Sequence, residues 1–202
     1  MNIRNMHQED ISQISELSIS TFADYDIMKK LGYEYLNNIF FPSILNSPLA
    51  QGMVICEKNN ILGYCVYFSD FRTFYQQLKK NAFWQNIYIV LSSVLTLNFS
   101  FNDILNIGLN HSKVMDKAVI PSHLGPIAIS TNIKGSAKGG FAILSLCRKA
   151  LSQLNKSGIN SCWGIADKRN LESQNLLTAL GFEYKDEISL FGRKDYLYIL
   201  NF

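Results

Sequence analysis

A glycine-rich turn at residues 134–140, Lys-Gly-Ser-Ala-Lys-Gly-Gly, is the stretch of this sequence best suited to hold a ligand. It follows an apolar segment, Leu124 to Ser130, and precedes a segment from Phe141 to Leu154 with apolar residues at helical spacing. A turn between a strand and a helix presents backbone N–H groups at the positive end of the helix dipole, where phosphate groups bind. The residues predicted to bind a phosphorylated ligand are Lys134, Gly135, Ser136, Ala137, Lys138, Gly139 and Gly140.

This turn matches neither of the two commonest glycine signatures, the dinucleotide motif G-x-G-x-x-G or the nucleoside triphosphate motif G-x-x-x-x-G-K-[ST]. It resembles the pyrophosphate loop [RQ]-x-x-G-x-[GA] of the GNAT superfamily of acyl-CoA-dependent N-acyltransferases. Lys134 occupies the basic position, Ala137 the first glycine and Gly139 the second. Lys134 and Ala137 depart from the consensus residues.

A second motif lies downstream, at residues 170–182. It resembles the superfamily's N-x-x-[AS]-x-x-L-[YL]-x-x-x-G-F, with every fixed position present and the spacing kept. The resemblance implies an α+β fold with α/β/α layers, in which helices flank a mixed, mostly antiparallel sheet of six to seven strands. It also implies acetyl-CoA or CoA as co-substrate, with no metal.

The resemblance assigns the cofactor contacts residue by residue. Backbone groups of residues 127–129 would bind the pantetheine arm, and the Ile129 N–H would donate to the thioester oxygen. Asn170 and Ser173 would contact the cofactor near its amides, although helix capping accounts for Asn170 equally well. Beyond the turn, the implied cofactor residues are Ile127, Ala128, Ile129, Asn170, Ser173 and Leu177.

His123 is the leading candidate for the base that takes a proton from the acceptor amine, which is protonated near neutral pH. It lies on the predicted fourth strand near the place where the resembled enzymes often carry a Glu. Strand alternation predicts that its side chain shares a face with Gly125, Ile127 and Ile129. A structural histidine at the start of a strand is the alternative, and the lower-ranked bases are His111, Glu57 and Asp70.

Leu177 stands where many members of the superfamily carry a tyrosine that protonates the departing thiolate. Leucine cannot donate a proton, so water or another side chain would have to do so. Tyr184 and Tyr198 are the candidate substitutes, and core packing is the alternative role for both.

Hydrophobic periodicity and turn residues predict the remaining elements. Strands are predicted at residues 2–6, 53–56, 61–68, 119–130, 159–166, 182–190 and 194–202. Helices are predicted at residues 8–19, 23–47, 141–157 and 170–180, and Pro42 and Pro48 are expected to end the second of these.

Composition favours one globular domain over residues 1–202, because 48% of the residues are hydrophobic and 17% are charged. The net charge of +3 includes no polybasic run, so nucleic-acid binding is not expected. The four cysteines form no C-x-x-C pair, which favours buried thiols over a disulfide or a zinc site. The N-terminus has no apolar export signal, so a cytoplasmic location is expected.

Residues 69–116 are predicted to form a helical, hydrophobic insertion between strands three and four. Within it, residues 82–101 carry no charge and are mostly apolar. Their polar residues make this stretch a poor membrane span, which favours a buried or interface helix. The insertion would suit a bulky or lipid-linked acceptor, or equally a homodimer interface. Peripheral membrane contact is the alternative. Similar insertions occur in GNAT-like proteins of surface-polysaccharide pathways.

These features together predict an enzyme that moves an acetyl or other acyl group from CoA to a primary amine of a small molecule. An amino sugar is the expected acceptor. The alternatives are a non-catalytic acyl-CoA-binding or regulatory protein with the same fold, and a protein or peptide N-acetyltransferase.

Overall fold

The computed structural model describes residues 1–24, 26–81, 117, 119–190 and 193–202. Seven strands form one sheet in the order β1-β2-β3-β4-β5-β7-β6. Neighbouring strands are antiparallel except β4 and β5, which are parallel. The strands are β1 (Asn2–Asn5), β2 (Ala50–Glu57), β3 (Asn60–Phe68), β4 (His123–Ile129), β5 (Ser161–Asp167), β6 (Glu183–Leu190) and β7 (Arg193–Asn201).

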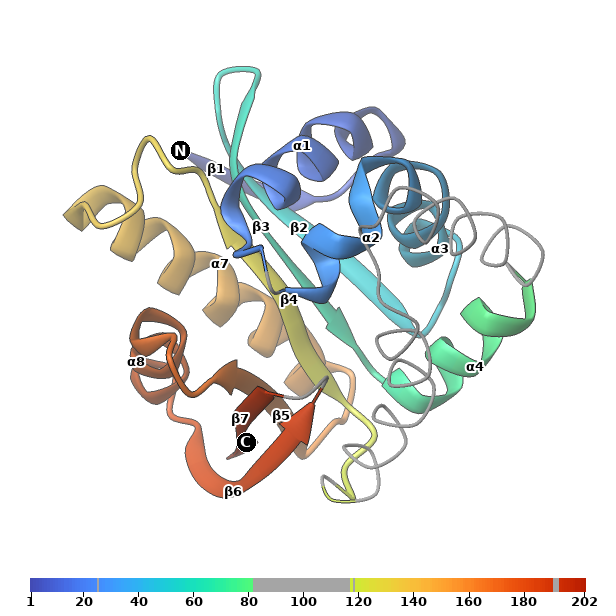
Figure 1. The fold of residues 1–202 in the computed structure, drawn as a ribbon, viewed down its shortest axis with the longest axis vertical. Helices are drawn as coiled ribbons and strands as arrows, with labels where there is room; N and C mark the ends of the chain where they lie inside the picture. Colours follow the sequence, from blue (N-terminus) through green and yellow to red (C-terminus); the bar gives the residue numbers. More distant parts are fainter. Residues whose placement is uncertain (25, 82–116, 118, 191–192) are drawn as a thin grey trace.

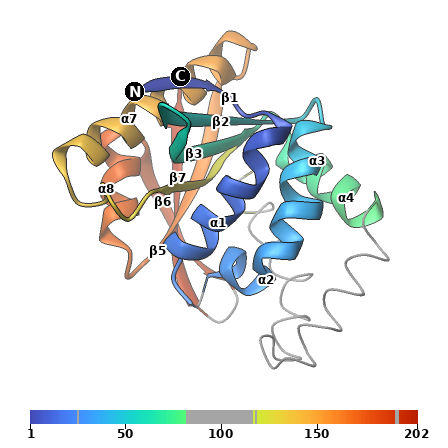
Figure 2. The same ribbon diagram turned by 90° about the horizontal axis from the view of Figure 1, so that it is seen from above.

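Helices cover both faces of this sheet, as Figures 1 and 2 show. The helices α1 to α4 lie on one face, and α7 and α8 lie on the other. This arrangement confirms the expected α+β class with α/β/α layers and a mixed sheet. The helical elements are η1 (Gln8–Asp10), α1 (Ile11–Thr21), α2 (Ile27–Tyr35), η2 (Leu36–Phe40), α3 (Phe41–Leu45), α4 (Phe71–Asn81), α7 (Ala137–Lys156) and α8 (Leu171–Ala179).

The alternation of side chains along the strands divides the core between the two faces. On the α1–α4 face, Tyr64 of β3 contacts Phe41, and Phe68 of β3 contacts Phe71 and Phe74 of α4. On the α7–α8 face, Cys65 packs against helix residues that are fully buried, and all four cysteines are buried free thiols. Burial raises the pKa of Cys65 and of Cys162, so these thiols are unreactive packing residues.

Helix α1 is fixed to the centre of the sheet by a short chain of hydroxyl groups. The Ser18 hydroxyl donates to the carbonyl of Ile14 at 2.7 Å, so the Tyr64 hydroxyl must donate to Ser18, also at 2.7 Å. At the end of α1, the Thr21 hydroxyl donates to the Ile129 carbonyl at 3.4 Å. These contacts hold the C-terminal end of α1 over the end of β4.

Two helix boundaries differ from the sequence-based expectation. Helix α7 begins at Ala137 and not near Phe141, because the Ser136 side chain caps it by accepting from the Gly139 N–H at 3.1 Å. Pro42 does not end a helix, because it lies in the first turn of α3, directly after the π-helical turn η2. Strand β4 is shorter than expected and begins at His123.

Helix α4 confirms a helix at the start of the predicted insertion. The rest of that insertion, including residues 82–101 and their proposed dimer or membrane contact, lies outside the described residues. Among the residues that the structure does describe, no helix is both long and apolar enough to cross a bilayer.

A partly buried ion pair fixes the N-terminal strand to the start of α1. Arg4 donates to both carboxylate oxygens of Asp10, at 2.6 and 2.8 Å, and the His7 N–H donates to the same group at 2.8 Å. Burial opposes ionisation of Asp10, but the hydrogen bonds from Arg4 and His7 outweigh it and lower the pKa of this carboxyl. The ionised form therefore stabilises the fold above the unfolded-state pKa of about 4.

Replacing Asp10 by Asn should lower the free energy of unfolding by about 2 kcal/mol at pH 7, because charge-assisted hydrogen bonds are lost. Between pH 5 and pH 3 the wild-type advantage should shrink, since the stabilisation disappears as the pH falls through the lowered pKa of Asp10. Urea unfolding at several pH values measures both effects. Asp24→Asn is the matched control, because Asp24 pairs with Lys29 at the surface with its side chain 93% exposed.

Candidate active site

The central parallel pair, β4 and β5, is joined at one end only. The ladder between the described parts of these strands consists of one pair, His123 with Trp163. The Trp163 N–H donates to the Ser122 carbonyl at 3.0 Å at the same point. Beyond this junction the described parts of the two strands are not paired, and the unpaired stretch between them is called the opening below.

An irregularity in β4 accompanies the opening. Between the pairs Cys65–Ile127 and Tyr67–Leu124 the register shifts, so β4 has an extra residue opposite β3. Such a bulge bends the strand and increases its local twist. Pro126 lies within the bulge and has no N–H to donate to either neighbouring strand.

The backbone of β4 beyond the bulge faces the opening at alternate residues. Ser130 donates its N–H to Leu62 on β3, so in an antiparallel ladder Ala128 also bonds to β3. The N–H and C=O groups of Ile127 and Ile129 therefore point toward β5. Ala128 instead contributes its methyl group to the core on the α1–α4 face.

Ile165 of β5 borders the opening on its other side, and this residue belongs to no sequence motif. Trp163 uses its N–H toward β4, so two residues later the backbone groups of Ile165 also point toward β4. The backbone groups of Gly164 and Ala166 point toward β7 instead. Ile165 could not have been identified from its type, because an apolar residue is expected at any buried strand position.

The turn predicted to bind phosphate lies where β4 runs into α7, and its residues 134–138 are exposed. The Ser136 N–H donates to the Ile133 carbonyl, and the Gly139 N–H donates to the Ser136 hydroxyl. The Gly140 N–H donates to the Ser136 carbonyl. Among the described residues, no acceptor contacts the backbone N–H groups of Gly135, Ala137 and Lys138. These three donors lie at the positive end of a 20-residue helix, which is a suitable site for a phosphate group.

Both lysines of the turn form exposed ion pairs. Lys134 Nζ lies 3.0 Å from Glu172 of α8, and Lys138 Nζ lies 2.8 Å from Glu57 of β2. Lys138 holds the pKa of Glu57 below its usual value through a hydrogen bond and its charge. Glu57 therefore lies beside the start of α7 and not beside His123, which removes it from the candidate bases.

His123 lies at the junction of β4 and β5 and is 7% exposed. Its ring stacks on Trp163 with centroids 3.8 Å apart and contacts Phe71 edge to face. His123 Nδ1 lies 3.1 Å from the Trp163 carbonyl, which can only accept, so Nδ1 carries the proton. In the neutral ring, the lone pair is then on Nε2, the atom that can accept a proton.

The expected alternation of His123 with Ile127 and Ile129 is wrong. His123 packs with Phe68 and Trp163 on the α1–α4 face, whereas the two isoleucines pack on the α7–α8 face. The bulge between Leu124 and Ile127 explains the difference, because one extra residue reverses the alternation of side chains.

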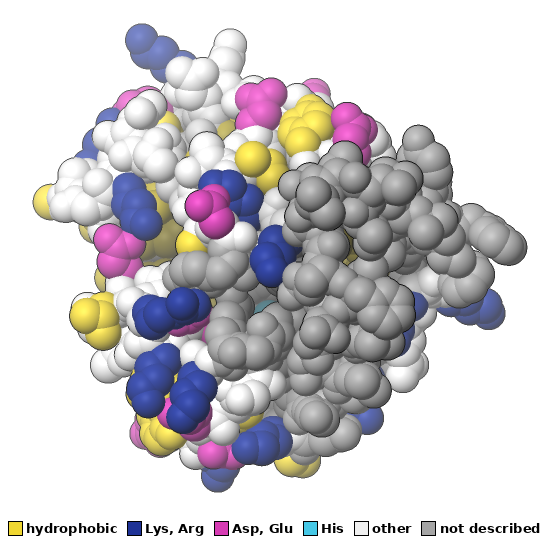
Figure 3. Space-filling model, viewed as in Figure 1, with side chains coloured by type: hydrophobic (Ala, Val, Ile, Leu, Met, Phe, Trp, Pro, Cys, Tyr) yellow, Lys and Arg dark blue, Asp and Glu magenta, His cyan; other side chains and the backbone are white. Residues whose placement is uncertain are grey.

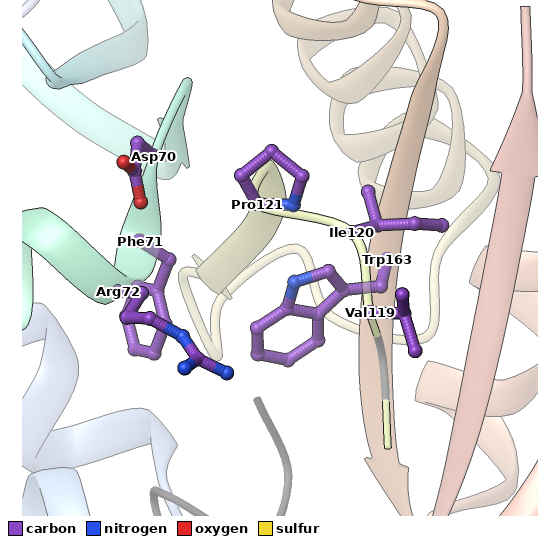
Figure 4. A pocket seen from close by; sticks show the side chains of 7 residues that line it. All are labelled: Asp70, Phe71, Arg72, Val119, Ile120, Pro121 and Trp163. Carbon is purple, nitrogen blue, oxygen red and sulfur yellow. The ribbon is translucent and has the colours of Figure 1, made fainter. Parts of the chain in front are cut away.

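A cavity of about 190 Å³ adjoins the His123–Trp163 pair. In Figure 4, the Arg72 guanidinium and the Trp163 indole project toward the same space. Both oxygens of Asp70 accept from Thr73, at 3.0 and 2.6 Å, so this carboxylate caps α4. The cavity is lined by Asp70, Phe71, Arg72, Val119, Ile120, Pro121 and Trp163.

The second motif forms α8 and packs it under β5. Asn170 accepts from the Ser173 N–H at 3.0 Å, so it caps the helix as expected. Leu177 is 3% exposed and lies against Gly164, where a Cβ atom would meet the leucine at 3.0 Å. Tyr198 pairs with Gly164 from β7 and belongs to the same buried cluster as Leu177.

The two candidate tyrosines have different surroundings. Burial, followed by the neighbouring Tyr196 and Tyr184, raises the pKa of Tyr198, which keeps its proton at neutral pH. Tyr184 is 57% exposed on the edge strand β6. Of the two, Tyr198 is the one that lies in the same buried cluster as Leu177, whose role it would take.

The remaining candidates and charges complete the description of the site. His111 lies outside the described residues. Within the described part of the chain, no group of three His, Cys, Asp or Glu residues lies close enough together to hold a metal ion. Figure 3 shows basic and acidic side chains interspersed over the part of the molecule that α7 and α8 occupy.

Solved structures share this architecture along the whole chain. A GNAT-family acetyltransferase from Streptococcus pneumoniae superposes with a TM-score of 0.59 at 15% identity, covering 99% of this chain and 98% of its own. An aminoglycoside 6′-acetyltransferase type Ii gives 0.60 at 9%, covering 100% and 97%. The PaiA N-acetyltransferase from Thermoplasma acidophilum, in complex with coenzyme A, gives 0.57 at 13%, covering 100% and 98%.

The chain therefore has the fold of GNAT acetyltransferases. No protein-family model matches the sequence, and no curated protein matches it.

Replacing Gly139 by Ala should destabilise the start of α7 by about 2 kcal/mol, because its Cβ would lie 2.1 Å from the Ile133 carbonyl oxygen. Gly140→Ala is the matched control, since a Cβ there meets nothing within 4 Å. It should raise stability by about 0.5 kcal/mol through helix propensity. Thermal unfolding of both variants distinguishes them, and equal effects would contradict the close approach.

Proposed function

We propose that this protein is an acyl-CoA-dependent N-acyltransferase that moves an acetyl group from acetyl-CoA to a primary amine of a small molecule. The observation that carries the proposal is the opening between β4 and β5, which leads from the His123–Trp163 junction to the exposed start of α7. A pantetheine arm carries amide groups that can pair with strand backbone as an added strand does.

The residues present fit coenzyme A at both ends of this path. Ile127 and Ile129 offer backbone groups on one side of the opening, and Ile165 offers them on the other. The N–H groups of Gly135, Ala137 and Lys138 suit the diphosphate. When bound, acetyl-CoA supplies the thioester carbon that the acceptor amine attacks.

His123 is the proposed base. Its Nδ1–H donates to the Trp163 carbonyl, so Nε2 is the ring atom that would take the proton from the acceptor ammonium group, directly or through water. The N–H groups of Ile127 and Ile129 are the donors that this chain offers to the thioester oxygen. Tyr198, or water, returns a proton to the thiolate that leaves.

The acceptor would approach on the α1–α4 face, where the His123 ring and the cavity beside Trp163 lie. An amino sugar, of the kind that surface-glycan pathways use, is the proposed acceptor class. One structure with this fold is an aminoglycoside acetyltransferase, which supports a sugar-borne amine as an acceptor.

A second function, acyl-CoA binding without turnover, is favoured by one observation. Leu177 is buried against Gly164 where the resembled enzymes often carry a tyrosine. Lys134 and Ala137 also depart from the loop consensus. A protein or peptide acceptor has support of the same kind as the amino sugar, because two structures with this fold are ribosomal-protein alanine acetyltransferases.

Incubation with acetyl-CoA and a panel of primary amines, amino sugars included, should release free CoA thiol only when an amine is present. The thiol can be followed with a chromogenic disulfide reagent, and the acetylated amine by mass spectrometry. Binding of acetyl-CoA without amine-dependent thiol release across the panel would contradict the enzyme and support the second function.

His123→Asn should lower kcat about a hundredfold, since a positioned base contributes on that scale. The asparagine amide can still donate to the Trp163 carbonyl, so the variant should fold and bind acetyl-CoA as the wild type does. The rate should also lose its rise with pH near neutrality. An unchanged pH–rate profile in this variant would remove His123 as the base.

A further inference from the structure

One ion pair joins the two sides of the opening between β4 and β5. Lys134 lies in the turn that follows β4, and Glu172 lies in the first turn of α8, which follows β5. Their charged groups are 3.0 Å apart, and the side chains are 42% and 66% exposed. The pair therefore spans the end of the opening at which the cofactor's phosphates would enter.

In this contact, Lys134, a cation of the proposed phosphate site, pairs with a carboxylate of the protein itself. Glu172 is the acidic residue in the first turn of α8, a position that the helix dipole favours. Within the described residues, Lys134 has no other ion-pair partner. An exposed pair of this kind shifts an equilibrium only a few-fold, so a phosphate group with a higher charge can displace the carboxylate.

We infer that Glu172 is an internal competitor that holds Lys134 across the opening and weakens the binding of phosphorylated ligands there. The inference rests on the proposed function, because it takes the phosphates of CoA as the ligand. Binding exchanges the Lys134–Glu172 pair for a contact between Lys134 and phosphate, and Glu172 is left to solvent. Glu172 thereby sets the affinity without contacting the cofactor.

The second lysine of the turn provides a comparison. Lys138 pairs with Glu57 at 2.8 Å, but Glu57 ends β2 and does not border the opening. Removing either glutamate lowers the negative charge near the turn by one. Only the removal of Glu172 releases a cation that lies across the opening.

The test is calorimetric titration of CoA, and of pantetheine as a probe without phosphate, into the wild type and four variants. The variants are Glu172→Gln, Lys134→Gln, the double variant of both, and Glu57→Gln. Glu172→Gln should tighten CoA binding about threefold at low salt, as expected for loss of an exposed ion pair, and leave pantetheine binding unchanged. In the Lys134→Gln background, Glu172→Gln should give no gain, because the two residues act through one contact.

Other results would overturn the inference. An unchanged or weaker affinity of Glu172→Gln for CoA would show that Glu172 does not compete. A gain that persists in the Lys134→Gln background would show general repulsion, as would an equal gain in Glu57→Gln. If neither the wild type nor any variant binds CoA, and the melting temperatures of the variants equal that of the wild type, the proposed function is wrong together with this inference.

Discussion

The separation of β4 from β5 is the constraint on which the rest of the site depends. Two parallel strands in the middle of a sheet normally pair along their length, because unpaired backbone groups inside a protein are costly. Here the described ladder stops after His123 and Trp163. Beyond it, the N–H groups of Ile127 and Ile129 and the backbone groups of Ile165 would gain a partner if another extended chain entered.

Local features of the sequence maintain this separation. The bulge before Ile127 bends β4 and reverses its alternation, while Pro126 cannot donate to a neighbouring strand. Pairing of β5 with β7 over seven residues holds the far side of the opening in place. The Thr21 hydroxyl at the end of α1 contacts the Ile129 carbonyl, so the helices of the α1–α4 face support the near side.

Periodicity and turn residues predicted the order of the strands along the chain, whereas the class of the fold was predicted from the resemblance of two motifs to the GNAT superfamily. Asn170 and Gly181 mark the ends of α8 by their types, and the structure has the cap and the positive φ of 91° that they indicate. The predicted start of α7 was four residues too late. Gly139 and Gly140 are typical of a loop, whereas the Ser136 cap starts the helix before them.

The candidate site was less predictable from the sequence than the fold, since backbone groups, which residues of any type provide, form much of it. A side-chain motif can indicate Lys134 or Asn170, but any apolar residue could stand at Ile165. The side on which His123 lies depends on one extra residue in β4, which periodicity does not reveal. The Lys134–Glu172 pair joins residues 38 positions apart, so only the folded chain brings them together.

The most direct measurement of the central claim is a titration of isotope-labelled protein with CoA, followed through the backbone amide signals by NMR. The account predicts that the largest shifts occur at Ile127, Ile129, Gly135, Ala137 and Lys138, whose N–H groups face the opening or the start of α7. Signals from β1 and β2 should change little. Saturating CoA that left these five amides unchanged, or that shifted only amides elsewhere in the protein, would contradict it.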